Sequence, residues 1–246
     1  GTNNTALGTD ALRLSTTAGE NAALGHQAAY SNTTGHSIVA IGYRASYLNS
    51  TSVRHIAIGF QANYGGTSTN DMVAVGYRAA YTASATTANK DNSTFIGHSS
   101  GEAGSVTTGP RNNVTYVGHE SGKQGSHTTG NFSQNVGIGN SALQANSATT
   151  GSVYFNTAVG TSAAQWGGLT SGTATANTAI GHQAMQGSSF TGSSDNTAVG
   201  YIALQNITSG QKNTALGSGA LNDNTSASYN TAVGYVAGGK LNSGQL

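Results

Sequence analysis

The sequence predicts an all-β protein that folds as a parallel β-solenoid of about thirteen coils. A short motif recurs in tandem along all 246 residues, its copies are nearly evenly spaced, and aliphatic or β-branched residues alternate within each copy. Examples are "NTALGTDAL" from Asn4, "NTAVGYIALQ" from Asn196 and "NTAVGYVAG" from Asn230. Tandem units of this length are typical of solenoids, in which each coil pairs its strands with the coils on either side.

A glycine that follows an aliphatic residue marks each unit, and we number the coils by it. These glycines are Gly8, Gly25, Gly42, Gly59, Gly76, Gly97, Gly118, Gly139, Gly160, Gly181, Gly200, Gly217 and Gly234. The intervals are 17 residues four times, 21 five times, 19 once and 17 twice. We therefore expect one continuous domain over residues 1–246, in which residues 77–181 carry loops that lengthen at one fixed place in each coil.

Positions within a coil are counted from its glycine. Position −1 is always Leu, Ile or Val, position −2 is Ala in ten of the thirteen coils, and position +3 is always Ala or Ser. Alternation with period two is typical of a β-strand. Because neighbouring strands are ~4.8 Å apart, thirteen coils would form a rod of roughly 58 Å. The glycine is expected to adopt a backbone angle closed to other residues or to allow close backbone approach. Asn, common at position −4, would form an amide ladder from coil to coil.

The alternation places positions −1 and −2 on opposite faces of the strand. We expect the aliphatic residues at −1 to face the interior, and the near-constant Ala at −2 to face another chain at close range. A 17-residue coil has a thin core, and oligomerisation is a common remedy for a marginal core. The predicted interface residues are Ala158, Ala179, Ala198 and Ala215. Position −2 is Phe95, Tyr116 and Gly137 in the three remaining coils, and the coils of Phe95 and Tyr116 must either widen the axis or turn this column elsewhere.

Composition excludes several functional classes. The formal net charge is +1, from 9 basic and 8 acidic residues, so bulk electrostatics predicts neither nucleic-acid nor anionic-membrane binding. There is no Cys, and no apolar run approaches the length of a membrane span, so no membrane insertion is expected. The chain begins inside a repeat, which is typical of a piece of a longer protein.

The motif N-T-A-[VIL]-G-x-x-A resembles the head repeat of YadA-like trimeric autotransporter adhesins, which also occurs in bacteriophage tail fibres. The resemblance covers all thirteen repeats, although units of 17 and 21 residues are longer than the usual repeat of that family. It implies a left-handed parallel β-roll, a homotrimeric fibre, and an extracellular location on a virion tail fibre or bacterial surface. It also implies non-enzymatic attachment to a glycan or protein on a host cell; the alternative is a purely structural filament or spacer whose receptor-binding part lies elsewhere.

Two ladders of planar side chains are predicted in coils two to five. Tyr30, Tyr47, Tyr64 and Tyr81 occupy position +5, while Tyr43, Phe60 and Tyr77 occupy position +1. Between them, position +2 alternates Gln27, Arg44, Gln61 and Arg78. Such a surface could bind sugar rings or bases; alternatively, the tyrosines only stack on one another, as side chains at one register of a repeat do.

The longer loops supply a second candidate receptor surface, because loops on rigid scaffolds carry binding. The predicted contact residues are Lys90, Arg111, Phe132, Tyr154, Phe155 and Trp166. Trp166, the only Trp, is the favoured contact residue; the competing interpretation is that it covers the apolar edge of its coil.

Metal-binding, catalytic and ice-binding sites are each less well supported by the sequence. His26, His98, His119 and His182 share position +1 and in a trimer could hold a metal or an anion, but this position also accepts Tyr and Phe, so no metal or cofactor is predicted. Of the carboxylates, only Glu102 and Glu120 could approach the spacing of a glycosidase pair, and no enzyme is predicted. An ice-binding solenoid would require a flat, exposed, regularly spaced Thr array.

Overall fold

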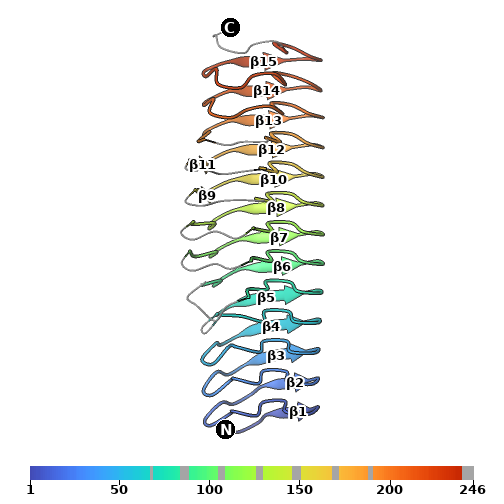
Figure 1. Cartoon of the computed structure of the whole chain (residues 1–246), viewed down its shortest axis with the longest axis vertical. Coiled ribbons are helices and arrows are strands. Elements are labelled where there is room, and N and C mark those ends of the chain that lie inside the picture. The colour runs from blue at the N-terminus through green and yellow to red at the C-terminus, as the bar shows by residue number, and fades with distance from the viewer. Residues whose placement is uncertain are drawn as a thin grey trace.

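The chain forms a parallel β-solenoid, shown by a computed structural model that describes residues 1–66, 69–83, 89–104, 109–125, 130–145, 151–167, 172–187 and 191–239. One strand from each of the thirteen repeats joins a single sheet along the long axis (Figure 1). Its strands are β1 (Thr5–Leu7), β2 (Ala22–Leu24), β3 (Ile38–Ile41), β4 (His55–Ile58), β5 (Met72–Val75), β6 (Thr94–Ile96), β7 (Thr115–Val117), β8 (Val136–Ile138), β10 (Thr157–Val159), β12 (Thr178–Ile180), β13 (Thr197–Val199), β14 (Thr214–Leu216) and β15 (Thr231–Val233). The described residues contain no helix. The predicted all-β solenoid is confirmed.

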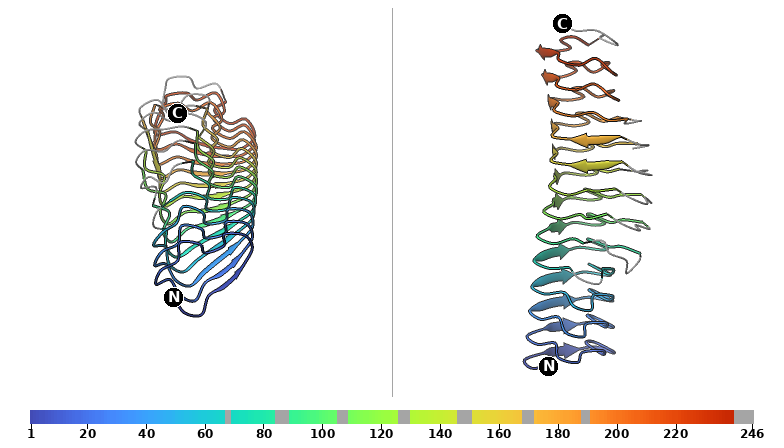
Figure 2. Two further views of the ribbon diagram at one scale, coloured as in Figure 1. Left: turned by 60° about the horizontal axis from the view of Figure 1, so that its bottom comes forward. Right: turned by 90° about the vertical axis from the view of Figure 1, so that its left-hand side faces the viewer.

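Every neighbouring pair of main-sheet strands is parallel and in register, so equivalent positions form straight columns. Ala198, for example, pairs with Ala179 on one side and Ala215 on the other. A second, two-stranded sheet joins β9 (Ser152–Tyr154) to β11 (Thr173–Thr175) in the long coils. Figure 2 shows the main-sheet strands stacked along one side of the roll.

The glycine column has both predicted properties. From Gly8 to Gly234 the φ angles lie between +124° and +139°, a region that L-residues rarely adopt. Except in the last coil, a Cβ atom here would also lie 2.3–2.6 Å from the carbonyl oxygen of the next glycine in the column. Glycine is therefore required by the backbone angle and by the close approach of adjacent coils.

The corners of each coil are made by residues in the left-handed region. Among the described residues, thirty-five non-glycine residues have positive φ: thirteen at position −5, twelve at +2 and ten at +4. In coil three they are Ser37, Arg44 and Ser46, at 58°, 52° and 55°. Three left-handed residues per coil turn the backbone sharply enough to close it within 17 residues.

The faces of the main sheet are opposite to the prediction. The alanines at position −2 are buried inside the roll, with Ala158, Ala179, Ala198 and Ala215 all at 0% exposure within the single chain. They face the small residues at +3, such as Ala163 and Ala203, also fully buried. In a 17-residue coil, the space between positions −2 and +3 is filled by the methyl groups of these two alanines. The aliphatic residues at −1 therefore point outward, and the prediction that the alanine column faces a neighbouring chain is wrong.

The predicted amide ladder is confirmed at both ends of the roll. From Asn156 to Asn230, each Asn at position −4 donates its backbone and side-chain N–H groups to Oδ1 of the Asn in the preceding coil, at 2.9–3.1 Å, and Asn135 is the first acceptor. Asn21 and Asn4 form the same pair, at 3.0 Å. The ladder satisfies buried polar groups without adding charge to a thin core.

Candidate functional surfaces

The outward face of the main sheet is the largest regular surface on the chain. Its two columns, positions −3 and −1 of every coil, contain no charged residue, and we call them the outer strip. Position −1 is half exposed or exposed in every coil, and its exposure reaches 67% at Leu7. A hollow of about 250 Å³ lies where Ala22 stands at −3, between Leu7, Leu24 and Ile41. The strip measures roughly 58 Å by about 7 Å, from the strand spacing and the rise along a strand.

Position −3 changes character along the outer strip. It is aliphatic at Val39, Ile56 and Val73 in coils three to five. From coil nine to coil thirteen it is always Thr, and the five side chains are in register and exposed or half exposed: Thr157, Thr178, Thr197, Thr214 and Thr231. This is a regularly spaced, outward-facing Thr column next to aliphatic neighbours.

Most of the predicted receptor contacts lie inside the roll. Lys90, Arg111, Phe132 and Trp166 are at most 1% exposed, so they present no surface to a receptor. Tyr154 is half exposed in β9, and Phe155, at 55%, lies edge-on to it with ring centroids 5.3 Å apart. The loops beside these residues lie in part outside the described residues, at 84–88, 105–108, 126–129, 146–150 and 168–171.

A single column explains why these large side chains are buried. Position −7 runs Ser52, Thr69, Lys90, Arg111, Phe132, Val153, Ala174, and its largest members occur where coils reach 21 residues. All seven are buried, because the wider coil must be filled from within. Trp166, at position +6, bridges Ala145 and Gly187 in another inward column, which is consistent with the competing interpretation that it covers its coil.

Lys90 and Arg111 place two cations in the core. The Lys90 ammonium donates to Asn63 Oδ1 at 2.9 Å, Gly65 O at 2.7 Å and Ala80 O at 2.6 Å, which matches its three N–H donors. Arg111 donates from Nη1 to Gly101 O at 2.5 Å. Burial, with Arg111 nearby, holds the pKa of Lys90 well below its usual value, and burial lowers the pKa of Arg111 to about 10. No carboxylate pairs with either cation among the described residues.

A buried polar network occupies coils three to six, where the Asn ladder is interrupted. His55 replaces Asn at position −4, and its Nε2 lies 2.6 Å from Ser46 Oγ. Asn49 donates to the same Ser46 oxygen at 3.1 Å and accepts from Thr69 at 3.1 Å. Burial first, and the charge of Lys90 second, lower the pKa of His55 to about 4.

This lowered pKa predicts an acid-sensitive fold. Because the folded-state pKa of His55 lies below its unfolded value of 6.5, the imidazole contributes stability above pH 6.5 that is lost as the pH falls towards about 4. The full difference corresponds to about 3 kcal/mol. We expect the free energy of unfolding, measured in urea by circular dichroism, to fall by about this amount between pH 7 and pH 4. His55→Met, which copies Met72 of the next coil, should remove most of that fall; an unchanged pH profile would contradict this origin.

The tyrosine ladder is a stack, as the structural interpretation predicted. Tyr30, Tyr47, Tyr64 and Tyr81 follow one another with ring centroids 5.2–5.3 Å apart. The ends are covered by cations: Arg13 lies 5.8 Å from the Tyr30 centroid and Arg78 lies 3.9 Å from that of Tyr81. Ring faces used in this way are not free to stack on sugar rings or bases, although the ring edges and hydroxyl groups remain.

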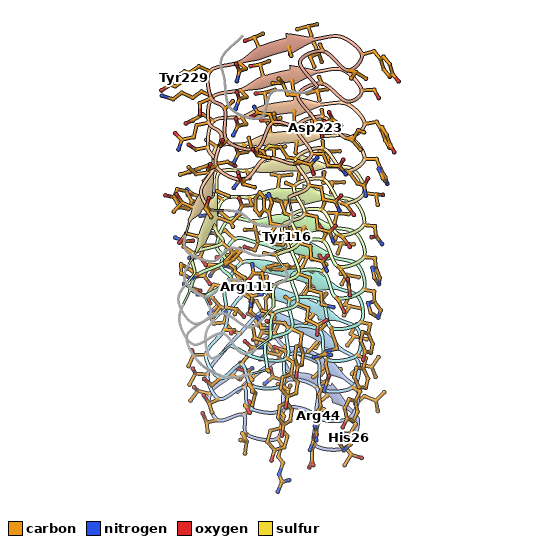
Figure 3. The ribbon with its side chains drawn as sticks, turned by 45° about the horizontal axis from the view of Figure 1, so that its top comes forward. His26, Arg44, Arg111, Tyr116, Asp223 and Tyr229 are labelled. Atoms are coloured by element: carbon orange, nitrogen blue, oxygen red, sulfur yellow. The ribbon has the colours of Figure 1, made fainter. Side chains whose placement is uncertain are left out.

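A second stack at position +1 explains the histidine column. His26, Tyr43, Phe60, Tyr77, His98 and His119 form an unbroken series with centroids 4.7–5.4 Å apart. His26 lies near the turn that follows its strand, close to Arg44 (Figure 3). Within the described ranges, no three His, Cys, Asp or Glu side chains lie close enough to hold a metal ion. The histidines act here as planar members of a stack.

The two candidate carboxylates are each engaged by a cation. Glu102 accepts from Arg78 at 3.0 Å. Glu120 accepts from Lys123 at 2.5 Å and from Gln144 at 3.0 Å. The bond from Lys123 is the main reason that the pKa of Glu120 lies below its usual value. A general acid requires a raised pKa, so this geometry gives no support to a glycosidase pair.

The described part of the chain holds no helix long and apolar enough to cross a bilayer. No family model matches the sequence, and neither the curated proteins nor the solved structures yield a match.

Proposed function

We propose that the chain is a segment of a homotrimeric fibre, made of left-handed β-rolls, that projects from a virion or a bacterial surface and mediates attachment to a host cell. The outer strip is the observation that carries this proposal. Its −1 column is aliphatic in every coil along the whole rod, and an exposed apolar patch of this kind on a soluble protein often marks an interaction site. Covering the outer strip with further copies of the same chain would remove it from water.

The outer strip, rather than the alanine column, would then form the interface. Its area, on the order of 400 Å² from the strand spacings, is about half of what a standard interface buries per partner. The flanking residues at positions +1 and −5 would supply the polar rim. A strip on one face of each roll can close around a rotation axis; the number three follows from the resemblance to trimeric autotransporter heads.

Assembly is testable with a matched pair of charge substitutions. Val199→Lys places an ammonium group on the outer strip, whereas Gln211→Lys adds the same charge at an exposed position outside it. We expect sedimentation equilibrium to show a trimer for the wild type and Gln211→Lys, and a folded monomer for Val199→Lys, because an unpaired buried charge costs several kcal/mol. A monomeric wild type, or a trimeric Val199→Lys protein, would contradict this interface.

The Thr column favours a second candidate function for the same face. A flat array of outward Thr and Val side chains, in register on parallel strands, is the surface that an ice-binding solenoid requires. The two uses exclude each other, because a strip covered by other copies cannot touch ice. A wild-type monomer with measurable thermal hysteresis, abolished by Thr197→Tyr, would favour ice binding; a trimer without hysteresis would favour the fibre.

A binding experiment distinguishes attachment by this segment from a role as a spacer. Fluorescently labelled trimer, free of any other fibre domain, is incubated with panels of bacterial and eukaryotic cells. Saturable binding to some cells supports attachment by this segment. A folded trimer that binds none of them supports the alternative, a spacer whose receptor-binding part lies elsewhere in the fibre.

A further inference from the structure

We infer that Arg44, with the tyrosine hydroxyls and amides beside it in coils two to four, forms a binding site for an acidic glycan that bears carboxylate groups. This inference rests on the proposed attachment function and names its ligand class. The site lies between the two ring stacks, beside the outer strip and not on it.

Arg44 is held rigidly in place. Its Nε donates to Gln27 Oε1 at 2.8 Å, and its guanidinium carbon lies 5.1 Å from the ring centroids of both Tyr43 and Tyr47. The side chain therefore has one hydrogen bond and two ring contacts that hold it. A guanidinium fixed in this way loses little entropy when its two terminal nitrogens bind a planar anion.

Arg44 also lacks the counter-charge that other surface arginines have. Arg13 pairs with Asp10 at 3.4 Å, Arg54 with Asp71 at 2.6 Å, and Arg78 with Glu102 at 3.0 Å. Among the described residues, no carboxylate lies within 4 Å of Arg44. The result is one preorganised positive charge in an otherwise neutral surface.

The surroundings favour a saccharide. Tyr30, Tyr47 and Tyr64 repeat every 5.2 Å along the rod, and Gln61 stands one coil above Arg44 at the same position. The ring faces are used by stacking, which leaves edges, hydroxyl groups and amides for a ligand. A surface that repeats its hydrogen-bonding groups from coil to coil suits a polymer that repeats its hydroxyl groups, and the single fixed guanidinium suits a polymer with spaced carboxylates.

The test uses the full chain in its native assembly and four probes of stated chemistry: hyaluronan, which carries carboxylates, polyglutamate, dextran sulfate and neutral dextran. We expect hyaluronan to bind at least tenfold more tightly than dextran by biolayer interferometry. Arg44→Gln should lose at least tenfold in hyaluronan affinity. Arg54→Gln, which removes the same charge from a paired arginine, should lose less than twofold.

Several outcomes would overturn the inference. Equal affinities of Arg44→Gln and Arg54→Gln would remove Arg44 from the site, and dissociation of the Arg44→Gln assembly would make Arg44 a subunit contact. Equal binding of polyglutamate and hyaluronan would indicate recognition of carboxylates on proteins, and preference for dextran sulfate would indicate a sulfate site. Cell attachment that does not change in Arg44→Gln would leave the attachment function standing and refute only this site.

Discussion

Gly160→Ala is expected to destabilise the roll strongly, because it adds a methyl group where two adjacent coils meet. Its Cβ would lie 2.5 Å from the carbonyl oxygen and 2.7 Å from the carbonyl carbon of Gly181 in the next coil. The backbone cannot move away without breaking the hydrogen bonds between coils, and φ of +131° is itself unfavourable for alanine. We expect the free energy of unfolding, from urea titration followed by circular dichroism, to fall by at least about 3 kcal/mol.

Gly234→Ala is the matched control. Gly234 has a similar φ of +124°, but a Cβ there would meet nothing within 4 Å among the described residues. This variant therefore carries the conformational cost without the clash, and we expect it to lose about 1–3 kcal/mol. Equal losses in the two variants would show that the backbone angle, and not the approach of adjacent coils, makes glycine necessary.

The sequence predicted where the main-sheet strands lie, but not which face of the sheet points into the roll. The glycine period located every main-sheet strand, and the roles of Gly and of the Asn at −4 followed from their own chemistry. Alternation with period two, however, is symmetric between the two faces of a strand. The aliphatic residue at −1 is too large for the interior, because the coil is narrow. Ala198 on the strand and Ala203 across from it are both fully buried and already fill this space.

The candidate site residues failed for a related reason. The sequence predicts that Lys90, Arg111 and Phe132 lie in the longer loops. Their constant offset of seven residues before the glycine was the signal that they belong to a core column, since a varying loop does not keep register. The preorganisation of Arg44, in contrast, depends on stacks between coils, which no local pattern in the sequence reveals.

The second large effect on stability is expected in coils six and seven, which have an aromatic ring at a position where most coils have Ala. Phe95 and Tyr116 occupy position −2 and are at most 1% exposed. In both coils position +4 is Gly with φ near +60°, and a Cβ at Gly101 would lie 2.2 Å from Phe95 Cδ1. Coil five has Ala74 and Ala80 at the same two positions, and Ala80 adopts φ of 54°. The ring therefore takes the space of the missing methyl group.

A double-mutant cycle tests this complementarity. Gly101→Ala should lose about 3 kcal/mol from overpacking, and Phe95→Ala should lose about 3–5 kcal/mol from the cavity that it leaves. The double variant recreates the alanine pair of coil five, so its loss in unfolding free energy should be smaller than the sum of the single losses by at least about 2 kcal/mol. Additive losses would mean that the ring and the glycine are accommodated independently. In that case, packing in the core would not explain why coils six and seven have Phe95 and Tyr116 instead of Ala at position −2.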